Sequence, residues 1–165
     1  MLEVLRSVIQ EVSRAGDLEA VLDIIVERVK DAMNTEVCSI YLHDEHDERF
    51  VFMATRGLNT DAVGKVSLAF DEGLVGYVAE RAEPINLEDA QNHPRNRLLE
   101  EVGEEPFHAF LGVPIIHHRK VLGVLVVQQM RTRRFDEGEE AFLITLSAQL
   151  AGVIAHAEAT GSLML

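Results

Sequence analysis

The chain begins with two stretches in which apolar residues recur every three or four positions, the spacing of one face of a helix. The first stretch ends at Gly16, and its recurring residues are Leu2, Leu5, Ile9 and Val12. In the second stretch they are Leu18, Val21, Leu22, Ile25 and Val29. Asp17 can accept hydrogen bonds from the free N–H groups of the second helix, and Asn34 can close its last turn. Residues 1–34 are therefore predicted to form two helices.

The period then changes to two, which is typical of β-strands. Residues 37–42 and 50–55 are rich in β-branched and aromatic side chains, and the polar residues 43–48 separate them. Two strands joined by a short polar link favour an antiparallel hairpin. A weak third strand is predicted at 66–68.

The middle of the chain is less regular. A short helix is predicted over 73–81, with Asp71 as its N-cap. Residues 87–106 hold most of the irregular sequence. Long loops of this kind often carry function.

Two long apolar runs follow, at 107–116 and 121–130, with the polar turn 117–120 between them. Because apolar residues occupy consecutive positions, both faces of these two strands are expected to be covered. A final helix is predicted from the spacing of Phe142, Leu143, Leu146, Leu150, Val153, Ile154 and Ala157. Asp136 and Glu139 have the spacing of a capping box at its start.

This order of elements predicts an α+β fold with a central antiparallel sheet of about five or six strands. The terminal helices are expected on one face of the sheet, and a pocket of loops and a short helix on the other. A single domain over 1–165 is expected, made of the helices 1–34, the sheet and pocket 35–134, and the helix 135–160. The second and the final helix carry apolar residues on two sides, which predicts a homodimer through the terminal helices.

Charge and cysteine content narrow the class of protein. The chain has 165 residues, with 28 acidic against 15 basic side chains and a net charge of −13. This charge argues against partners such as nucleic acid and anionic membrane surfaces, which need Lys/Arg-rich faces. No unbroken apolar segment approaches about 18 residues, so no membrane span is predicted. Cys38 is the only cysteine, which excludes an internal disulfide and a Cys-based zinc site and fits a reducing cytoplasm.

The residues that could carry catalysis or bind a metal give no enzyme signature. His117 and His118 are adjacent, and adjacent side chains of a strand point to opposite faces, so they are poorly placed to share a metal. The histidines at 43 and 46 lie in a predicted polar turn and are interpreted as surface residues. Cys38 lies in an apolar strand, where a buried structural thiol is expected. Neither a metal nor a cofactor is predicted.

Two features leave a ligand contact and a structural role both open. Gly73 and Gly76 flank a predicted helix start, whose free N–H groups suit a carboxylate or phosphate but equally suit a cap with close packing. Gln128 and Gln129 interrupt an apolar run, so one amide must face each side of the sheet. An unpaired buried amide costs about 1–3 kcal/mol, so a ligand, a backbone group or water must serve it.

The motifs resemble those of a GAF domain, a small-molecule sensor module. The segments that carry this resemblance are 111–116, 122–125 and 135–143. The pattern is closer still to the N-terminal sensor domains of nitrogen-branch phosphoenolpyruvate–protein phosphotransferases (enzyme I). The segments that carry this closer resemblance are 35–42, 53–58, 69–76, 83–87, 110–116 and 124–129. Together they span almost the whole chain.

The resemblance implies a regulatory role. Such a parent enzyme transfers a phosphoryl group from phosphoenolpyruvate to its own histidine and then to a carrier protein. That chemistry belongs to downstream enzyme I domains, which would be this domain's partners, so no catalysis is expected of this chain. The sensor is implied to read glutamine and 2-oxoglutarate and to adjust autophosphorylation. The cyclic-nucleotide signature is not matched, because Phe135 and Asp136 are contiguous and an upstream Asn-Lys pair is missing.

A site for a small-molecule metabolite is predicted on the sheet face opposite the terminal helices, under residues 70–101. The chemistry and position of ten residues make them candidates to line it. They are two arginines for a carboxylate (Arg56, Arg97), two backbone N–H donors (Gly73, Leu74), three polar side chains for an amide or amine (Asn86, Asp89, Gln128) and three apolar walls (Phe70, Val75, Phe110).

Two other functions remain open at this stage. The apolar faces of the terminal helices are also consistent with a dimerisation module whose pocket is collapsed and binds no ligand. A Cys-dependent enzyme, such as the methionine-sulfoxide reductases built on this fold, needs reactive cysteines. A single Cys38 in an apolar strand argues against that enzyme.

Overall fold

The computed structural model describes residues 2–96 and 107–159. The α-helices are α1 (Leu2–Arg14), α2 (Leu18–Met33), α3 (Gly73–Arg81) and α4 (Glu137–Ala159). The strands are β1 (Val37–Asp44), β2 (Arg49–Arg56), β3 (Ser67–Leu68), β4 (Ile85–Leu87), β5 (Ala109–His117) and β6 (Lys120–Gln129). Two short 3₁₀ turns are η1 (Thr60–Ala62) and η2 (Ala90–Asn92).

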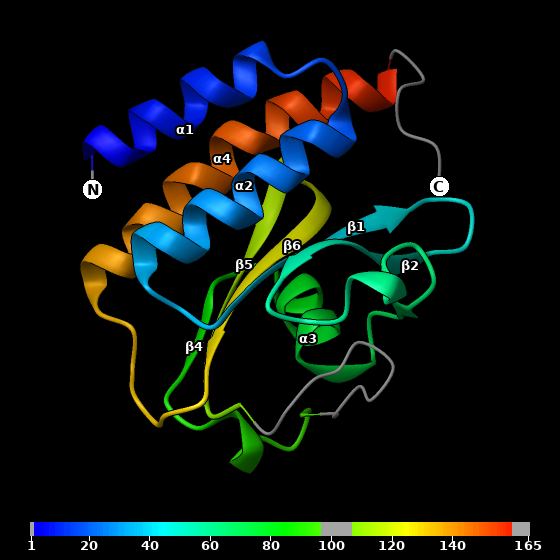
Figure 1. The fold of residues 1–165 in the computed structure, drawn as a ribbon. Helices are drawn as coiled ribbons and strands as arrows, with labels where there is room; N and C mark the ends of the chain where they lie inside the picture. The colour runs from blue at the N-terminus through cyan, green and yellow to red at the C-terminus, as the bar shows by residue number, and fades with distance from the viewer. Residues whose placement is uncertain (1, 97–106, 160–165) are drawn as a thin grey trace.

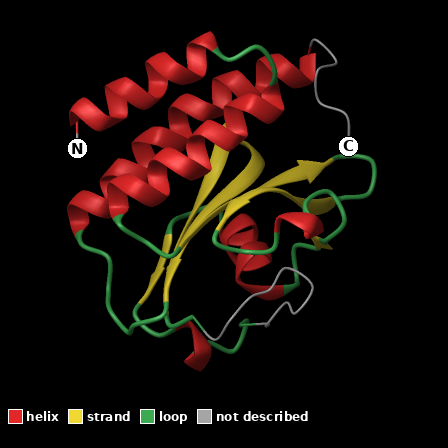
Figure 2. Ribbon diagram, in the orientation of Figure 1, coloured by secondary structure: helices red, strands yellow, loops and turns green. Residues whose placement is uncertain are grey.

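The strands of the described residues form one antiparallel sheet in the order β3-β2-β1-β6-β5-β4. Helices α2 and α4 cover one face, α1 packs against these two helices from outside, and α3 packs on the other face (Figure 1). Figure 2 shows the same layers by element type. The α+β fold, the antiparallel sheet of six strands and the placement of the terminal helices on one face are confirmed.

Each central strand contributes to two separate cores, as expected for strands covered on both faces. The helix-side core takes Leu111, Val113 and Ile115 from β5, together with apolar side chains of α1, α2 and α4. The α3-side core takes Phe110 from the same strand and Val124 from β6, together with α3. A shift of register by one residue would exchange the two sets, so burial on both faces fixes the register.

The predicted ends of α2 and the predicted start of α4 are confirmed. The Asp17 side chain accepts a hydrogen bond from Ala20 N at 2.8 Å, and Asn34 closes α2 in the left-handed conformation at φ 53°. At the start of α4, Asp136 Oδ1 accepts from Glu139 N at 2.8 Å, and Glu139 Oε1 accepts from Asp136 N at 2.9 Å. This reciprocal pair is the capping box that the spacing predicts.

The start of α3 differs from the prediction. Its N-cap is Glu72 rather than Asp71, and the Glu72 side chain makes no cap hydrogen bond to the helix. Glu72 Oε1 instead accepts from Ala69 N and from Arg49 Nη2. A Cβ at Gly76 would lie 2.4 Å from the carbonyl oxygen of Ala69. Gly76 is therefore required by close packing of α3 on the preceding loop.

The adjacent histidines also differ from the prediction. The His117 and His118 rings are stacked, with centroids 4.0 Å apart and planes 15° apart. His118 and Arg119 both adopt positive φ angles, 49° and 68°, in the turn between β5 and β6. The alternation of a strand therefore ends at His117, and the turn brings the second ring back over the first.

Helix α4 is long and apolar. Residues 137–157 have a mean hydropathy of 1.4, enough by length and composition to cross a membrane, but 44% of that segment is buried inside the protein. Core helices of folded domains meet the same criterion, and here Leu143, Leu146 and Ile154 lie in the helix-side core. This burial accounts for the apolar residues on the sheet-facing side of the helix.

We predict that Gly76→Ala destabilises the domain by about 1–3 kcal/mol, because α3 must move away from Ala69. The matched control is Gly138→Ala in the first turn of α4, where the nearest atom to a Cβ lies at 3.4 Å. The control is expected to be neutral or to stabilise by about 0.5–1 kcal/mol. Urea unfolding of both variants measures this, and equal stability of the two would contradict the packing role of Gly76.

Candidate functional site

The sheet face under α3 is built from alternate residues of four strands. Tyr41, Phe52, Phe110 and Val126 are buried on this face. Helix α3 covers them with the buried residues Leu74, Val75, Val78 and Ala79. Three of the predicted lining residues, Leu74, Val75 and Phe110, are therefore brought together in one apolar layer.

Gln128 adds an amide to this layer. It is 6% exposed and lies opposite Phe110 of β5 and Val37 of β1. Because it follows Val126 by two positions, it shares the α3-side face. The neighbouring Gln129 belongs to the other face by the same alternation. Its Nε2 donates to Asn34 O at 3.1 Å and its Oε1 accepts from Arg133 Nε at 2.5 Å. One glutamine on each face is what the sequence predicts.

A buried pair of hydroxyls lies on the same face, and the sequence analysis missed it. Ser39 Oγ and Thr55 Oγ1 are 2.9 Å apart, and their residues are 0% and 2% exposed. Ser39 lies opposite Thr55 of β2 and opposite Val126 of β6. The alternation of β1, which places Ser39 on the same side as Tyr41, is the signal that could have found it. Its hydrogen-bond partner is another hydroxyl and not a base that would activate it as a nucleophile.

His43 is a second residue that the sequence analysis placed differently. It lies in β1 rather than in a polar turn and is only 8% exposed. Its ring packs against Phe50 and Phe70, with centroids 5.0 and 5.7 Å away. Nε2 lies 3.1 Å from Glu48 Oε2, while Nδ1 has no hydrogen-bond partner within the described part of the chain. The predicted wall residue Phe70 thus covers a buried histidine at the edge of the α3-side layer.

Gly73 and Asp89 both lie at the ends of elements on this side of the molecule. Gly73 begins α3 with φ 64°. Asp89 caps η2 and accepts from Asn92 Nδ2 at 2.9 Å. Its Oδ1 also lies 2.8 Å from His108 Nδ1, just before β5. Asp89 therefore fastens the segment that follows β4 to the start of β5.

Two predicted site residues lie away from this face, and the predicted site is corrected accordingly. Arg56 Nη1 donates to Asp23 Oδ1 of α2 at 2.8 Å, and Nη2 lies 3.7 Å from Glu27 Oε2. The hydrogen bond to Asp23 raises the pKa of Arg56. Its guanidinium is thus held by acidic groups of α2 and is not placed to pair with a ligand carboxylate under α3.

Asn86 is the other displaced residue. It pairs with Leu111, which faces the helices, so its side chain points to that face as well. Its Nδ2 donates to Phe135 O at 2.8 Å and to Glu140 Oε2 at 3.0 Å. Its Oδ1 accepts from Phe135 N at 3.3 Å. Both ends of the amide are therefore engaged at the start of α4. The remaining candidate, Arg97, lies outside the described residues.

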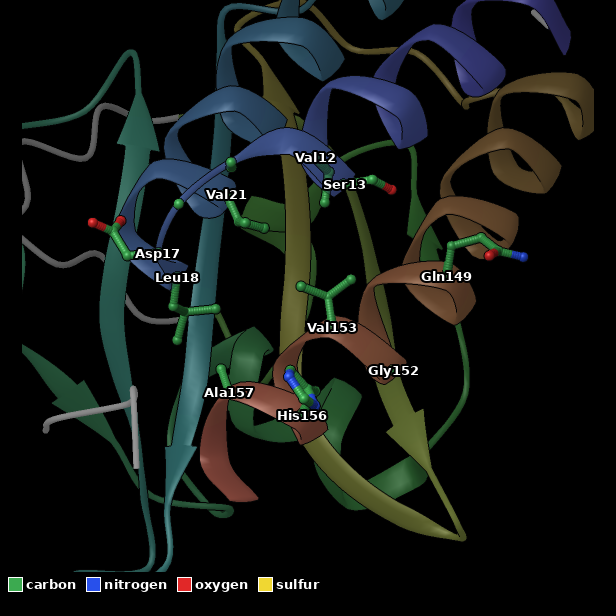
Figure 3. A pocket seen from close by; sticks show the side chains of 12 residues that line it. Val12, Ser13, Asp17, Leu18, Val21, Gln149, Gly152, Val153, His156 and Ala157 are labelled. Atoms are coloured by element: carbon green, nitrogen blue, oxygen red, sulfur yellow. The ribbon is translucent and has the colours of Figure 1, made fainter. Parts of the chain in front are cut away.

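A cleft of about 650 Å³ lies on the opposite side of the molecule, where the link between α1 and α2 meets the C-terminal half of α4. Side chains from all three helices surround it (Figure 3). Its lining is Val12, Ser13, Ala15, Gly16, Asp17, Leu18, Val21, Gln149, Gly152, Val153, His156 and Ala157. A second groove of about 460 Å³ runs between α2 and β2 and is lined by Arg56, Asp23, Asp17 and Glu19 among others.

The groups that metal binding or thiol chemistry would require are not assembled in the described residues. Within 2–96 and 107–159, no three His, Cys, Asp or Glu side chains are grouped to hold a metal ion. Cys38 is 0% exposed in the helix-side core, and burial raises the pKa of its thiol. A thiol that stays protonated is a poor nucleophile. The layer under α3 thus combines apolar walls with one amide and two hydroxyls.

Comparison with known proteins agrees with this fold. The model of the GAF domain family matches residues 17–154. Because this match covers most of the chain, the protein belongs to the GAF domain family.

The relatives specify the kind of GAF domain. The chain is 52% identical over 161 residues to a protein of the phosphoenolpyruvate-dependent phosphotransferase system of Salmonella typhimurium, a match over 97% of this chain and 21% of that protein. It is 48% identical to the GAF domain of a phosphoenolpyruvate-protein phosphotransferase of Coxiella burnetii, with a TM-score of 0.94 over 98% and 96% of the two chains. It is 49% identical to the GAF domain of an Acinetobacter phosphoenolpyruvate-protein phosphotransferase, with a TM-score of 0.90 over 98% of this chain and 97% of that chain. The chain thus spans about a fifth of the length of the curated relatives it matches.

We predict that Cys38 does not react with a soluble thiol reagent in the folded protein, because its sulfur is enclosed and protonated. Reaction with Ellman's reagent is expected to reach one thiol per chain only after unfolding in guanidinium chloride. Stoichiometric reaction of the folded protein within minutes would contradict this prediction and support the alternative of a Cys-dependent enzyme.

Proposed function

We propose that this chain is the metabolite-sensing regulatory domain of a cytoplasmic phosphoenolpyruvate–protein phosphotransferase. The proposed ligands are glutamine and 2-oxoglutarate, and the proposed response is a change in autophosphorylation by downstream enzyme I domains. The observation that carries the proposal is the α3-side layer, in which a buried amide and a buried pair of hydroxyls lie among apolar walls. The similarity to phosphotransferase GAF domains supplies the context.

The polar groups of this layer suit a small ligand with amide or carboxylate groups. Gln128 can both donate and accept, so it can pair with a primary amide or with a carboxylate oxygen. One O–H of the Ser39–Thr55 pair is used between the two hydroxyls, so the other O–H can donate to a carboxylate. Val75 and Phe110 supply the apolar contact for a short carbon chain. The proposed site thus keeps Gln128, Val75 and Phe110 from the sequence prediction, adds Ser39 and Thr55, and leaves out Arg56 and Asn86.

The proposed mechanism is a shift of population between two arrangements of the domain. A ligand changes this equilibrium only by the difference between its affinities for the two arrangements. Because α3 covers the layer, ligand binding is proposed to change the position of α3. Helix α4 packs on the other face of the same sheet and is proposed to transmit the change to the downstream domains.

We predict that isothermal titration of the folded domain detects saturable binding of glutamine or 2-oxoglutarate. Gln128→Leu is expected to weaken that binding about tenfold, the effect of losing a buried hydrogen bond to the ligand. The control Gln10→Leu, on the exposed side of α1, should bind as the unaltered domain does. Thermal unfolding confirms that both variants are folded. No binding of either metabolite to a folded sample would contradict the proposed ligands.

A second candidate function, dimerisation, is supported by the outer surface of α4. Residues 141–155 contain no charged side chain. The exposed positions of this stretch are Ala141, Ile144, Thr145, Ala148, Gln149 and Gly152. The stripe continues into the cleft of Figure 3. A charge-free surface of this length favours contact with another apolar surface. The proposed partner is a second copy, and a dimer is compatible with sensing.

We predict a dimer in analytical ultracentrifugation at micromolar concentration. Ile144→Glu is expected to give a folded monomer, because it places a charge in the proposed contact. Ile116→Glu is the matched control, since Ile116 and Ile144 are 38% and 39% exposed. A monomeric unaltered domain, or a dimer that both variants leave intact, would contradict an interface on α4.

A further inference from the structure

Asn86 makes two elements of the domain into one hydrogen-bonded unit. Its amide donates to the carbonyl of Phe135 and accepts from the N–H of the same residue. It also donates to the Glu140 carboxylate in the first turns of α4. From Arg134, Nη1 donates to Asn86 O at 3.3 Å. The side chain therefore binds Phe135 as a neighbouring strand would, although 49 residues separate the two.

The strand that holds Asn86 has its other face in the proposed site. Ile85 and Leu87 pack against the α3-side core, while Asn86 points to the helices. Strand β4 is three residues long and lies at the edge of the sheet. It follows α3 directly in the chain and precedes the segment that Asp89 fastens to His108. Displacement of β4 on the site side therefore moves the Asn86 amide on the helix side.

The start of α4 is held by several contacts. A movement of β4 must therefore either break the hydrogen bonds of Asn86 or move the start of α4. Phe135 is 2% exposed in the helix-side core. Arg133 forms two hydrogen bonds with Glu139, both at 2.8 Å, and its guanidinium lies 4.2 Å from the centre of the Phe135 ring. The hydrogen bond from Arg133 lowers the pKa of Glu139, which keeps this pair ionised. Residues 133–140 therefore respond as a unit.

We infer that Asn86 is the positioning residue that couples the site under α3 to the start of α4. A ligand under α3 that shifts Ile85 or Leu87 also moves the Asn86 amide. Phe135 and Glu140 then move with it, because they are hydrogen-bonded to that amide. Coupling of this kind requires that the β4–α4 contact has two arrangements, and that both the site under α3 and the start of α4 change the equilibrium between them. The inference takes its biological meaning from the proposed function, but the mechanical coupling can be measured without any ligand.

Hydrogen–deuterium exchange of the domain tests the coupling directly. Leu87→Ala perturbs β4 on the site side, and in a chain that keeps Asn86 it should raise exchange in peptides covering residues 135–143 about tenfold. In the Asn86→Ala background, where these peptides already exchange faster, Leu87→Ala should add nothing further. The control background is Asn92→Ala, an exposed asparagine of η2 whose side chain donates to Asp89 three residues away, and there the effect of Leu87→Ala should persist. Equal effects of Leu87→Ala with and without Asn86 would overturn the inference.

A second variant keeps the test decisive if Asn86→Ala lowers stability overall. Asn86→Asp retains an acceptor for Phe135 N but sets a carboxylate against Glu140. Exchange at 135–143 should rise, and Glu140→Gln in the same chain should restore part of the protection, because the glutamine amide can donate to the new carboxylate. Absence of rescue, with Glu140→Gln alone unchanged, would count against the specific contact.

The response of the whole phosphotransferase separates this inference from the proposed function. If glutamine or 2-oxoglutarate binds, Asn86→Ala should retain binding in titration while the effect of the metabolite on autophosphorylation is lost. Retention of the full effect would overturn the role of Asn86. If neither metabolite binds the unaltered protein, the proposed ligands are wrong, and the exchange experiment still decides the coupling.

Discussion

The structure depends on the burial of both faces of its three central strands. Because β1, β6 and β5 are covered on each side, their side chains divide by alternation into a helix-side core and an α3-side core. The two cores differ in chemistry. The helix-side core is dominated by aliphatic side chains, whereas the α3-side face holds Tyr41, Phe52 and Phe110 together with the Ser39–Thr55 pair and Gln128. The register that stabilises the fold therefore also places the polar groups of the proposed site.

Most of the fold can be read from the sequence because its long elements have a clear period. The apolar stripes of α2 and α4, the caps at Asp17 and Asp136 and the two long strands are all local patterns. The short elements are harder to read. Asn86 lies in a strand of three residues, too short to display a period, so the face it would take could not be predicted. His43 shows the same difficulty at a strand end, where β1 extends two residues past the apolar run.

The site was predicted less well than the fold, because long-range contacts decide it. Arg56 has a side chain long enough to reach α2, and its ion pairs with Asp23 and Glu27 join residues far apart in the sequence. The apolar walls Val75 and Phe110 were predictable, since strand and helix patterns assign their faces. Ser39 is absent from the predicted site residues, because its hydroxyl partner Thr55 is 16 residues away on the next strand. Its position beside Tyr41 on one face of β1 follows from the alternation of the strand.

The central claim is that a metabolite binds under α3 and not in the cleft between the terminal helices. Two-dimensional ¹H–¹⁵N NMR during titration with glutamine and with 2-oxoglutarate tests it most directly, because each residue reports separately. The account predicts saturable shifts at Gln128, Ser39 and the backbone of α3, followed by shifts at Phe135 and Glu140. Shifts confined to Leu18, Val153 and the other residues of the cleft, or no shift for either metabolite, would contradict it.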